Sequence, residues 1–367
     1  MTANANVIEV TSDLSRHNLA SFDDLIDVRS PSEFADDHIP GAINLPVLSD
    51  KERADVGTIY VQTSRFEARR MGAAYVSANI AHHLRTSLAA KPKSYRPLIY
   101  CWRGGMRSNS MATVLSAIGW RCCTVAGGYK MWRRRVVGDL CEDGPPYPLL
   151  LIDGQTGTAK TRIIELLSGT GTQVIDLEGL AQHRGSVFGA RAEFPQPSQK
   201  LFESQLFGAV MASDLGRPIV VEAESRMIGR RALPKRFLAS MQVAPRIEIK
   251  APVRVRSKYL IEMYADLTRS DTQLAARVED LRQYHVRNTI ESWLELASRG
   301  AYQELATALM TQHYDPLYDR QRRKRADEPV YVAELQNLDD ATLAQAAADI
   351  AAFVRERGNP SRMREAV

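Results

Sequence analysis

Residues 96–108 read Arg-Pro-Leu-Ile-Tyr-Cys-Trp-Arg-Gly-Gly-Met-Arg-Ser. The apolar run 98–100 predicts a short buried strand, which delivers Cys101 into a loop with two glycines and two arginines. Apolar residues at helical spacing then predict a helix over 109–118. The stretch therefore places a thiol at a turn from a strand into a helix.

The surroundings of this thiol favour its ionised form. Backbone N–H groups of the loop, the positive end of the helix dipole and the side chains of Arg103 and Arg107 all favour negative charge on sulfur. Because the thiolate is the nucleophilic form of cysteine, we predict that Cys101 is a catalytic residue. The alternative is a buried structural cysteine, although apolar cores do not ordinarily surround one with Arg-Gly-Gly-Met-Arg.

Short apolar strands alternate with helices on both sides of this stretch. Strands are predicted at 8–10, 25–29 and 121–125, and residues 50–95 are predicted to be largely helical. This alternation indicates an α/β fold with a parallel sheet, in which the working loop lies at the C-terminal end of a strand.

Four blocks in this region occur in the order found in rhodanese domains. The blocks are Asp27-Val28-Arg29, His38-Ile39-Pro40-Gly41-Ala42-Ile43-Asn44, the Cys101 loop, and Gly127-Gly128-Tyr129 followed by Trp132. The N-terminal part of the chain therefore resembles a rhodanese domain. The resemblance implies that Cys101 carries sulfur or selenium, and that Arg103, Arg107 and the loop N–H groups hold the anionic donor.

The spacing Cys-x5-Arg from Cys101 to Arg107 is also used by protein phosphatases to bind phosphate. Tyr100, however, stands where most such phosphatases carry histidine, and no general-acid aspartate loop is visible. A loop for sulfur or selenium transfer is therefore favoured over a phosphatase loop. Cys122 and Cys123 lie on a predicted strand and are interpreted as small core residues.

The composition is that of a globular protein. The 367 residues are enough for two or three domains of about 100–200 residues each. The net charge of +5 permits a polyanionic partner, although a generally basic surface would give the same value. No signal peptide, no apolar run of about 18 residues and no metal-ligand or disulfide spacing of the four cysteines is visible. We therefore expect no membrane segment and a reducing, cytoplasmic location.

A stiff, turn-rich segment at 144–148, Gly-Pro-Pro-Tyr-Pro, predicts a domain boundary. A buried strand, the loop Asp-Gly-Gln-Thr-Gly-Thr-Ala-Lys-Thr at 153–161 and an amphipathic helix follow, which is the context of a P-loop. Such a loop surrounds phosphates with backbone N–H groups, while its lysine supplies positive charge and its threonine reaches a magnesium ion. The predicted ligands of a diphosphate are Gly154, Gly157, Lys160 and Thr161.

Ala159 departs from the common P-loop pattern, which has glycine immediately before the lysine. A Cβ at this position narrows the loop and restricts its backbone. We therefore expect diphosphate binding rather than ordinary ATP hydrolysis. His183 and Arg184, which precede Gly-Ser in a loop further along the chain, are predicted to contact the same anion.

Acidic residues accompany the next two predicted strands. A strand at 173–178 would place Asp176 and Glu178 on one face. Glu222, near the end of another strand, occupies the place of the acid that manages metal and water in P-loop proteins. These three carboxylates are candidates for orienting a magnesium-bound water or a substrate hydroxyl, and polar caps at strand ends are the alternative.

Several further blocks narrow the resemblance. They read Asp176-Leu177-Glu178-Gly179-Leu180-Ala181, His183-Arg184-Gly185-Ser186, Gln196-Pro197-Ser198-Gln199 and Glu222-Ala223-Glu224-Ser225-Arg226. Together with the rhodanese-like part, they make the chain resemble the bacterial tRNA 2-selenouridine synthase family, from about residue 20 to at least 320. We expect an N-terminal rhodanese-like parallel-sheet domain at 1–143, a P-loop NTPase-like α/β domain at 144–250, and a helical C-terminal part at 251–367 packed on the P-loop domain.

The family resemblance implies a tRNA substrate, and basic side chains suit its phosphates. The strongest run of charge is Arg-Gln-Arg-Arg-Lys-Arg at 320–325. A solvated surface is the usual interpretation of such a run, but a tRNA substrate favours phosphate contact. The candidates for tRNA binding are Arg226, Arg230, Arg254, Arg322, Arg323 and Arg325.

The resemblance further implies selenium insertion into 2-thiouridine at the tRNA wobble position. Sulfur is first geranylated from geranyl diphosphate, and selenium from selenophosphate, supplied by selenophosphate synthetase, then replaces it. We expect no tightly bound cofactor, although Mg²⁺ can accompany the diphosphate. Two other classes stay open: a sulfurtransferase relay fused to a kinase or ATPase module, and a nucleotide-gated protein that binds tRNA or a partner.

Overall fold

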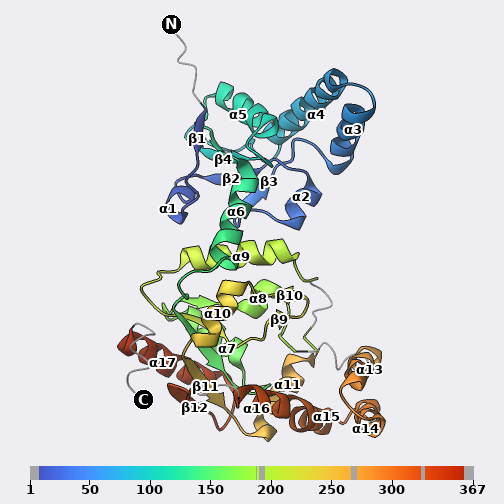
Figure 1. The fold of residues 1–367 in the computed structure, drawn as a ribbon, viewed down its shortest axis with the longest axis vertical. Helices are drawn as coiled ribbons and strands as arrows, with labels where there is room; N and C mark the ends of the chain where they lie inside the picture. The colour runs from blue at the N-terminus through green and yellow to red at the C-terminus, as the bar shows by residue number, and fades with distance from the viewer. Residues whose placement is uncertain (1–7, 187, 190–194, 266–270, 324–326, 359–367) are drawn as a thin grey trace. The chain divides into compact units, whose positions relative to one another are not determined.

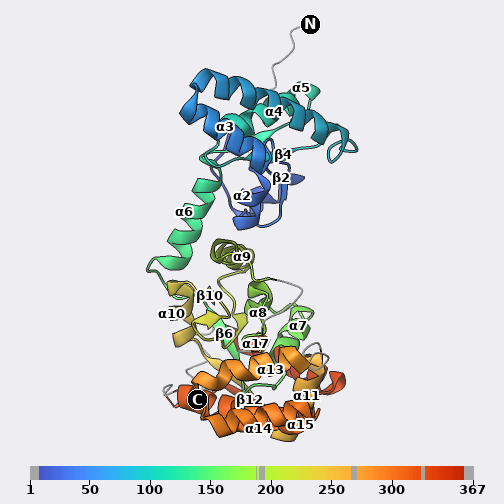
Figure 2. The same ribbon diagram turned by 90° about the vertical axis from the view of Figure 1, so that its right-hand side faces the viewer.

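The computed structural model describes residues 8–186, 188–189, 195–265, 271–323 and 327–358 (Figures 1 and 2). The chain divides into two compact units. The first comprises Met1–Glu142 with Pro197–Ala212, and the second comprises Asp143–Gln196 with Ser213–Val367.

The first unit is built on a parallel five-stranded sheet with the order β1-β5-β4-β2-β3. Its strands are β1 (Glu9–Thr11), β2 (Asp24–Asp27), β3 (Ala42–Asn44), β4 (Pro97–Tyr100) and β5 (Cys123–Val125). Ile26 of β2 lies opposite Ile99 of β4, and both side chains are fully buried. The predicted parallel sheet is therefore confirmed, with the Cys101 loop at the C-terminal end of a central strand.

Helices cover this sheet and supply its core. They are α1 (Arg16–Leu19), α2 (Pro31–Asp36), α3 (Asp50–Gln62), α4 (Arg65–Arg85), α5 (Met106–Ile118) and α6 (Gly128–Cys141). The helices α3 and α4 lie side by side, as Figure 1 shows, and confirm that residues 50–95 are largely helical. The helix after the cysteine loop begins at Met106 rather than at residue 109, because Ser108 lies in its first turn and donates to the carbonyl oxygen of Gly105.

A seventh helix, α9 (Gln199–Ala212), groups with the first unit although its residues lie in the range 144–250 predicted for the second domain. It packs on α6, where the indole nitrogen of Trp132 donates to Ser204 at 3.0 Å. Ser204 in turn donates to Asp37 at 3.1 Å. Sequence order could not reveal this packing, and the three predicted domain limits stay a prediction.

The second unit contains a parallel sheet with the order β12-β11-β6-β8-β7. Its strands are β6 (Leu149–Asp153), β7 (Val174–Ile175), β8 (Ile219–Glu222), β11 (Arg246–Lys250) and β12 (Tyr331–Glu334); a separate hairpin is formed by β9 (Met227–Ile228) and β10 (Arg231–Ala232). The C-terminal part is helical as predicted, and it also contributes the short strand β12 to the sheet. Four residues are too short for a periodic signal, and pairing with β11 makes β12 a strand.

Helices of the second unit form two groups. Their bounds are α7 (Lys160–Ser168), α8 (Leu177–Ala181), α10 (Lys235–Val243), α11 (Val253–Met263), α13 (Asp271–Glu279), the 3₁₀ turn η1 (Asp280–Gln283), α14 (Arg287–Ser298), α15 (Tyr302–Leu309), the π-helical turn η2 (Met310–Tyr314), α16 (Asp315–Arg322) and α17 (Asp340–Arg357). Buried Ile163 of α7 and Ile350 of α17 share a core with the sheet. A second core joins α13, α14 and α15, which lie together in Figure 2, around buried Trp293.

No helix in the described ranges is both long and apolar enough to cross a membrane.

Candidate functional site

Cys101 directly follows β4 and is only 3% exposed. Its sulfur accepts a hydrogen bond from the Gly105 N–H at 3.2 Å and lies 3.3 Å from the Ser108 hydroxyl. Burial raises the pKa of a thiol, but the hydrogen bonds from Ser108, Gly105 and the Arg103 backbone outweigh it, so the pKa of Cys101 lies below its ordinary value. The loop therefore stabilises a thiolate, as its sequence predicts.

The two arginines of this loop have different surroundings. Arg107 donates to the Glu33 carboxylate at 2.9 Å, a partner that the sequence did not indicate. To bind a donor anion, the Arg107 guanidinium has to contact the anion and Glu33 at the same time, or break its ion pair with Glu33. Arg103 lines a surface hollow together with Lys130 and Arg134, so three cationic side chains gather beside the cysteine loop.

The other cysteines lack this polarisation. Burial raises the pKa of Cys122 and Cys123, which supports their interpretation as core residues. Burial followed by the charge of Glu203 raises the pKa of Cys141. Of the four thiols, only Cys101 is shifted towards the thiolate.

The predicted P-loop connects β6 to α7, and its shape depends on glycine. Gly157 has φ +83°, and a Cβ placed there would lie 2.9 Å from Cγ of Leu260 and 3.0 Å from the carbonyl oxygen of Arg256. Both the backbone conformation and the close approach of α11 therefore exclude a side chain. A larger residue would push the loop away from α11.

Ala159 occupies the left-handed region, with φ 60° and ψ 31°, immediately before α7. This conformation costs an L-residue roughly 1–2 kcal/mol, which is the physical reason that glycine suits the position. The alanine methyl packs into the core that α7 shares with the sheet. The loop therefore adopts this left-handed turn although alanine stands where the common P-loop pattern has glycine.

Lys160 and Thr161 begin α7 and point their polar atoms towards the loop and α8. The Lys160 ammonium donates to the carbonyl oxygens of Gly154 at 2.7 Å and Gln155 at 3.3 Å. These acceptors are neutral, so the charge of Lys160 can act on an anion in the loop. Thr161 donates to the Glu178 carboxylate at 2.6 Å.

Beside this loop lies a cavity of about 260 Å³, which we call the P-loop cavity. Its wall includes Gly157, Lys160, Thr161, Glu178, Arg184 and Glu224. The structure thus brings together four of the six predicted diphosphate ligands. Gly154 does not line the cavity and contributes the carbonyl that receives Lys160.

The prediction that Asp176 and Glu178 share one face of a strand is wrong. The strand β7 ends at Ile175, because the Asp176 carboxylate accepts from the Gly179 N–H at 2.6 Å and caps α8. Glu178 lies inside that helix and faces the P-loop cavity. Glu222 is fully buried and accepts from the Leu177 N–H at 2.9 Å, so it and Asp176 hold α8 in place.

Glu224 is a further site residue, for which the block Glu222-Ala223-Glu224-Ser225-Arg226 did not indicate a role. It lines the P-loop cavity beside Lys160 and Glu178. Burial, followed by the charge of Glu178, raises the pKa of Glu224 to about 8, and Lys160 acts in the opposite direction. Its position two residues after Glu222, just beyond the end of β8, is the feature of the sequence that could have indicated a place in the site.

Comparison with known proteins agrees with this pair of sites. A family model described as "tRNA 2-selenouridine synthase AAA domain" matches residues 147–299, and one described as "Rhodanese-like domain" matches residues 10–135. The tRNA 2-selenouridine synthase of Shewanella denitrificans is 32% identical over 339 residues, covering 84% of this chain and 90% of that protein. The chain belongs to the tRNA 2-selenouridine synthase family.

Two other synthases show the extent of the similarity. That of Shewanella oneidensis is 31% identical over 360 residues, with 88% of this chain and 94% of that protein covered. That of Nitrosomonas europaea is 37% identical over 244 residues, with 65% and 63% covered. The predicted family, and the order of a rhodanese-like part before a P-loop part, are confirmed.

The sequence context of His183 predicts contact with the diphosphate, but the structure places this residue away from the P-loop cavity. The residue is 7% exposed, and its ring packs against the turn between β9 and β10, where a Cβ on Gly229 would lie 2.6 Å from the ring. It is not among the residues that line the P-loop cavity. Arg184, the next residue, does line it, and its guanidinium lies 5.0 Å from the centre of the Tyr264 ring.

The arginines predicted to bind tRNA in this synthase-family chain are unequally exposed. Arg226, Arg230, Arg254 and Arg323 are exposed. Arg322 forms an ion pair with Glu248, which neutralises its charge. Arg325 lies outside the described residues. Contact with tRNA stays a prediction for this set.

Proposed function

We propose that this chain converts 2-thiouridine at the wobble position of tRNA into 2-selenouridine, in two stages with geranylated sulfur between them. The observation that carries the proposal is that one polypeptide holds both a polarised thiol and a P-loop cavity whose lining includes Lys160 and Arg184. Membership of the synthase family supports the tRNA substrate. Geranyl diphosphate and selenophosphate are the donors that we assign to the two stages.

In the first stage, the sulfur of 2-thiouridine attacks C1 of geranyl diphosphate. The C1–O bond breaks, diphosphate leaves with its electron pair, and the N3 proton passes to solvent. Lys160, Arg184 and the loop N–H groups stabilise the charge that develops on the departing diphosphate.

Mg²⁺ fits the same cavity. This ion prefers oxygen ligands and is commonly held by one or two carboxylates together with substrate phosphates. The Thr161 hydroxyl and the Glu178 carboxylate, 2.6 Å apart, are the residues that would hold it. When bound, it would add positive charge beside the diphosphate. The described residues contain no cluster of three or more His, Cys, Asp or Glu side chains suited to a metal.

In the second stage, the Cys101 thiolate attacks C2 of the geranylated base, and the geranyl thiolate leaves and takes up a proton. Selenium of selenophosphate then displaces Cys101 from C2, and water cleaves the P–Se bond to release phosphate. Every step is a two-electron substitution without a change of redox state. Splitting one displacement into two in this way is the general advantage of a covalent intermediate.

The decisive experiment incubates thiolated tRNA with geranyl diphosphate, with and without selenophosphate, and identifies the nucleosides by mass spectrometry. We expect geranylated thiouridine in the first reaction and selenouridine in the second. Selenium insertion that does not depend on geranyl diphosphate would contradict the two-stage route. Rapid turnover of ATP would instead support the kinase or ATPase alternative.

Glu224 predicts a pH dependence of the first stage. Its carboxyl group is mostly neutral below its pKa of about 8 and adds negative charge to the cavity above it. The affinity for geranyl diphosphate should therefore fall as pH rises through 8, by roughly fivefold for one added charge nearby. Glu224→Gln stays neutral and should lose this fall.

Binding of geranyl diphosphate to both proteins between pH 6.5 and 9.5 tests this. Ionisation of the ligand itself affects both proteins equally, so the ratio of the two affinities is the informative quantity. If the affinities of the wild type and of Glu224→Gln change with pH in the same way, Glu224 does not titrate beside the ligand.

Binding of tRNA should weaken with salt, because displaced counterions dominate such affinities. Arg323→Ala should reduce the slope of log affinity against log salt by about 0.7–0.9, the value for one lost phosphate contact. Arg322→Ala is the matched neighbour, and its ion pair with Glu248 predicts a smaller change. Filter binding from 50 to 300 mM salt would measure both slopes, and equal slopes in all three proteins would exclude this surface.

A further inference from the structure

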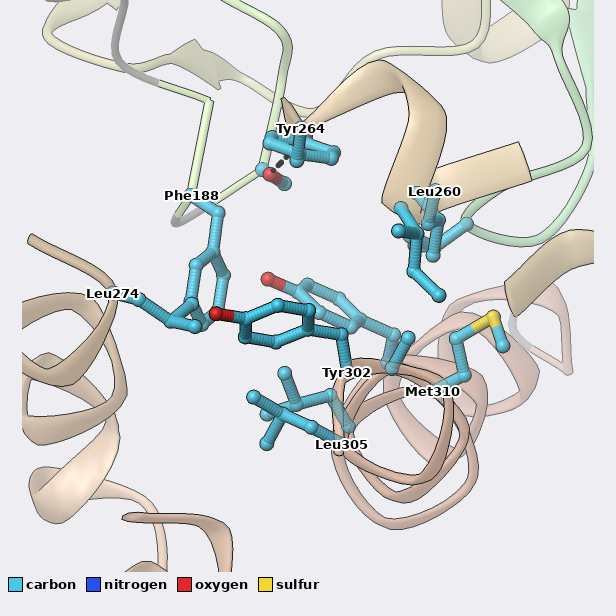
Figure 3. Close-up of a pocket in the computed structure, with 13 residues that line it drawn as sticks. Phe188, Leu260, Tyr264, Leu274, Tyr302, Leu305 and Met310 are labelled. Atoms are coloured by element: carbon cyan, nitrogen blue, oxygen red, sulfur yellow. Dashed lines mark hydrogen bonds between the residues drawn. The ribbon is translucent and has the colours of Figure 1, made fainter. Parts of the chain in front are cut away.

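A second cavity, which we call the apolar cavity, lies in the helical part of the second unit (Figure 3). Figure 3 shows Phe188, Leu274 and Tyr302 on one side of it and Leu260 and Met310 on the other. Its walls come from α11, α13, α15, η2 and the loop that carries Phe188. The lining is mostly hydrocarbon and aromatic, so it offers little to a polar ligand.

The apolar cavity adjoins the P-loop cavity. The two share Thr156, Ser186, Leu260, Tyr264 and Tyr314 as lining residues. Leu260 also reaches the P-loop itself, since its Cγ would lie 2.9 Å from a Cβ on Gly157. A ligand can therefore have one end at the loop and the other in the apolar cavity.

Tyr264 marks the border between the two chemical environments. Its hydroxyl lies 2.9 Å from that of Ser186, the contact drawn in Figure 3, and its ring lies under the Arg184 guanidinium. Polar and cationic groups are thus on one side of this ring, and aliphatic side chains are on the other.

We propose that the apolar cavity binds the far end of the hydrocarbon tail of an allylic diphosphate whose diphosphate lies on the P-loop. The assignment rests on the proposed function and deepens it. A nucleotide suits this arrangement poorly, because a purine in a mostly hydrocarbon pocket would leave hydrogen-bonding groups unsatisfied. A prenyl tail has none.

The size of the cavity predicts selectivity for tail length. It encloses about 80 Å³, whereas an apolar protein cavity that holds benzene measures about 150 Å³. The cavity therefore accepts a few carbon atoms at the end of the tail, and the preceding carbons lie along Leu260 and Tyr264. We therefore expect a five-carbon tail to gain little from the apolar cavity, and a twenty-carbon tail to exceed its volume.

The test fills the cavity from α15. Ala306→Leu places a larger side chain among the lining residues. We expect its affinity for geranyl diphosphate to fall at least about tenfold, the effect of excluding two or more buried carbons. Affinities for dimethylallyl diphosphate and inorganic diphosphate should stay within about twofold of the wild type. Thr307→Leu is the matched control, since Thr307 lines a separate hollow beside Gln303 and Glu304 and does not line the apolar cavity.

A second variant protects the test against misfolding of the first. Leu305→Ala enlarges the cavity and should raise the affinity for the fifteen-carbon farnesyl diphosphate relative to geranyl diphosphate. If Ala306→Leu lowers the affinities for the five- and ten-carbon diphosphates equally, or lowers neither, the assignment is overturned. It is also overturned if Leu305→Ala leaves the ratio of the affinities for farnesyl and geranyl diphosphate unchanged. Normal tail-dependent binding without transfer to tRNA would instead refute the proposed function and leave the cavity assignment intact.

Discussion

Lys160→Ala should lower geranyl transfer to thiolated tRNA by about 10²–10³-fold, the usual effect of removing one group that stabilises charge in the transition state. Lys160 lines the P-loop cavity, and its ammonium contacts only neutral carbonyl oxygens among the interactions of the loop. Because the diphosphate is charged both when bound and when leaving, the loss should appear both in the KM for geranyl diphosphate and in kcat. Nucleoside mass spectrometry over a time course, at several concentrations of geranyl diphosphate, measures it.

Arg162→Ala is the matched control for this variant. Arg162 lies two residues further along the same helix, is paired with Glu165 at 3.0 Å, and does not line the P-loop cavity. Its removal should leave transfer within about twofold of the wild type. Lys160→Ala supplied with tRNA that is already geranylated should still insert selenium, because no diphosphate departs in that stage. Full geranyl transfer by Lys160→Ala would refute the role assigned to the P-loop.

Cys101→Ala should abolish selenium insertion, by at least about 10³-fold, as expected when a covalent nucleophile is removed. Geranyl transfer should continue, because the cysteine loop and the P-loop are different sites. The hydrogen bonds from Gly105 and the Ser108 hydroxyl stabilise the attacking thiolate, and no other cysteine has a lowered pKa. Geranylated tRNA with selenophosphate is the substrate pair that isolates this stage.

Burial of Cys101 requires a second variant, since a buried alanine leaves a small gap. Cys101→Ser keeps nearly the same volume and the same hydrogen bonds but offers a hydroxyl that is not ionised, so it should be equally inactive. Cys122→Ala, at a buried thiol with a raised pKa, should retain both activities. Loss of geranyl transfer in Cys101→Ser would contradict the separation of the two stages.

Local patterns in the sequence were sufficient where neighbouring residues determine a structure. The strand–loop–helix context predicted both the Cys101 loop and the P-loop, because an apolar run, glycines and a helical period are local features. The same approach was wrong at Asp176, where a helix cap ended the predicted strand after Ile175. A short apolar run followed by an acid is compatible with either outcome.

Sequence motifs were therefore sufficient to predict the family, the parallel α/β architecture, the position of Cys101 at the start of a loop and that of Lys160 at the start of a helix. Three features became visible only in the folded chain: the pairing of Arg107 with Glu33, the place of Glu224 in the P-loop cavity, and the packing of α9 with the first unit. The apolar cavity likewise combines side chains from residue 156 to residue 314. The physical reason is that backbone preferences act between near neighbours, whereas burial, charge pairing and cavity shape arise from side chains brought together by folding.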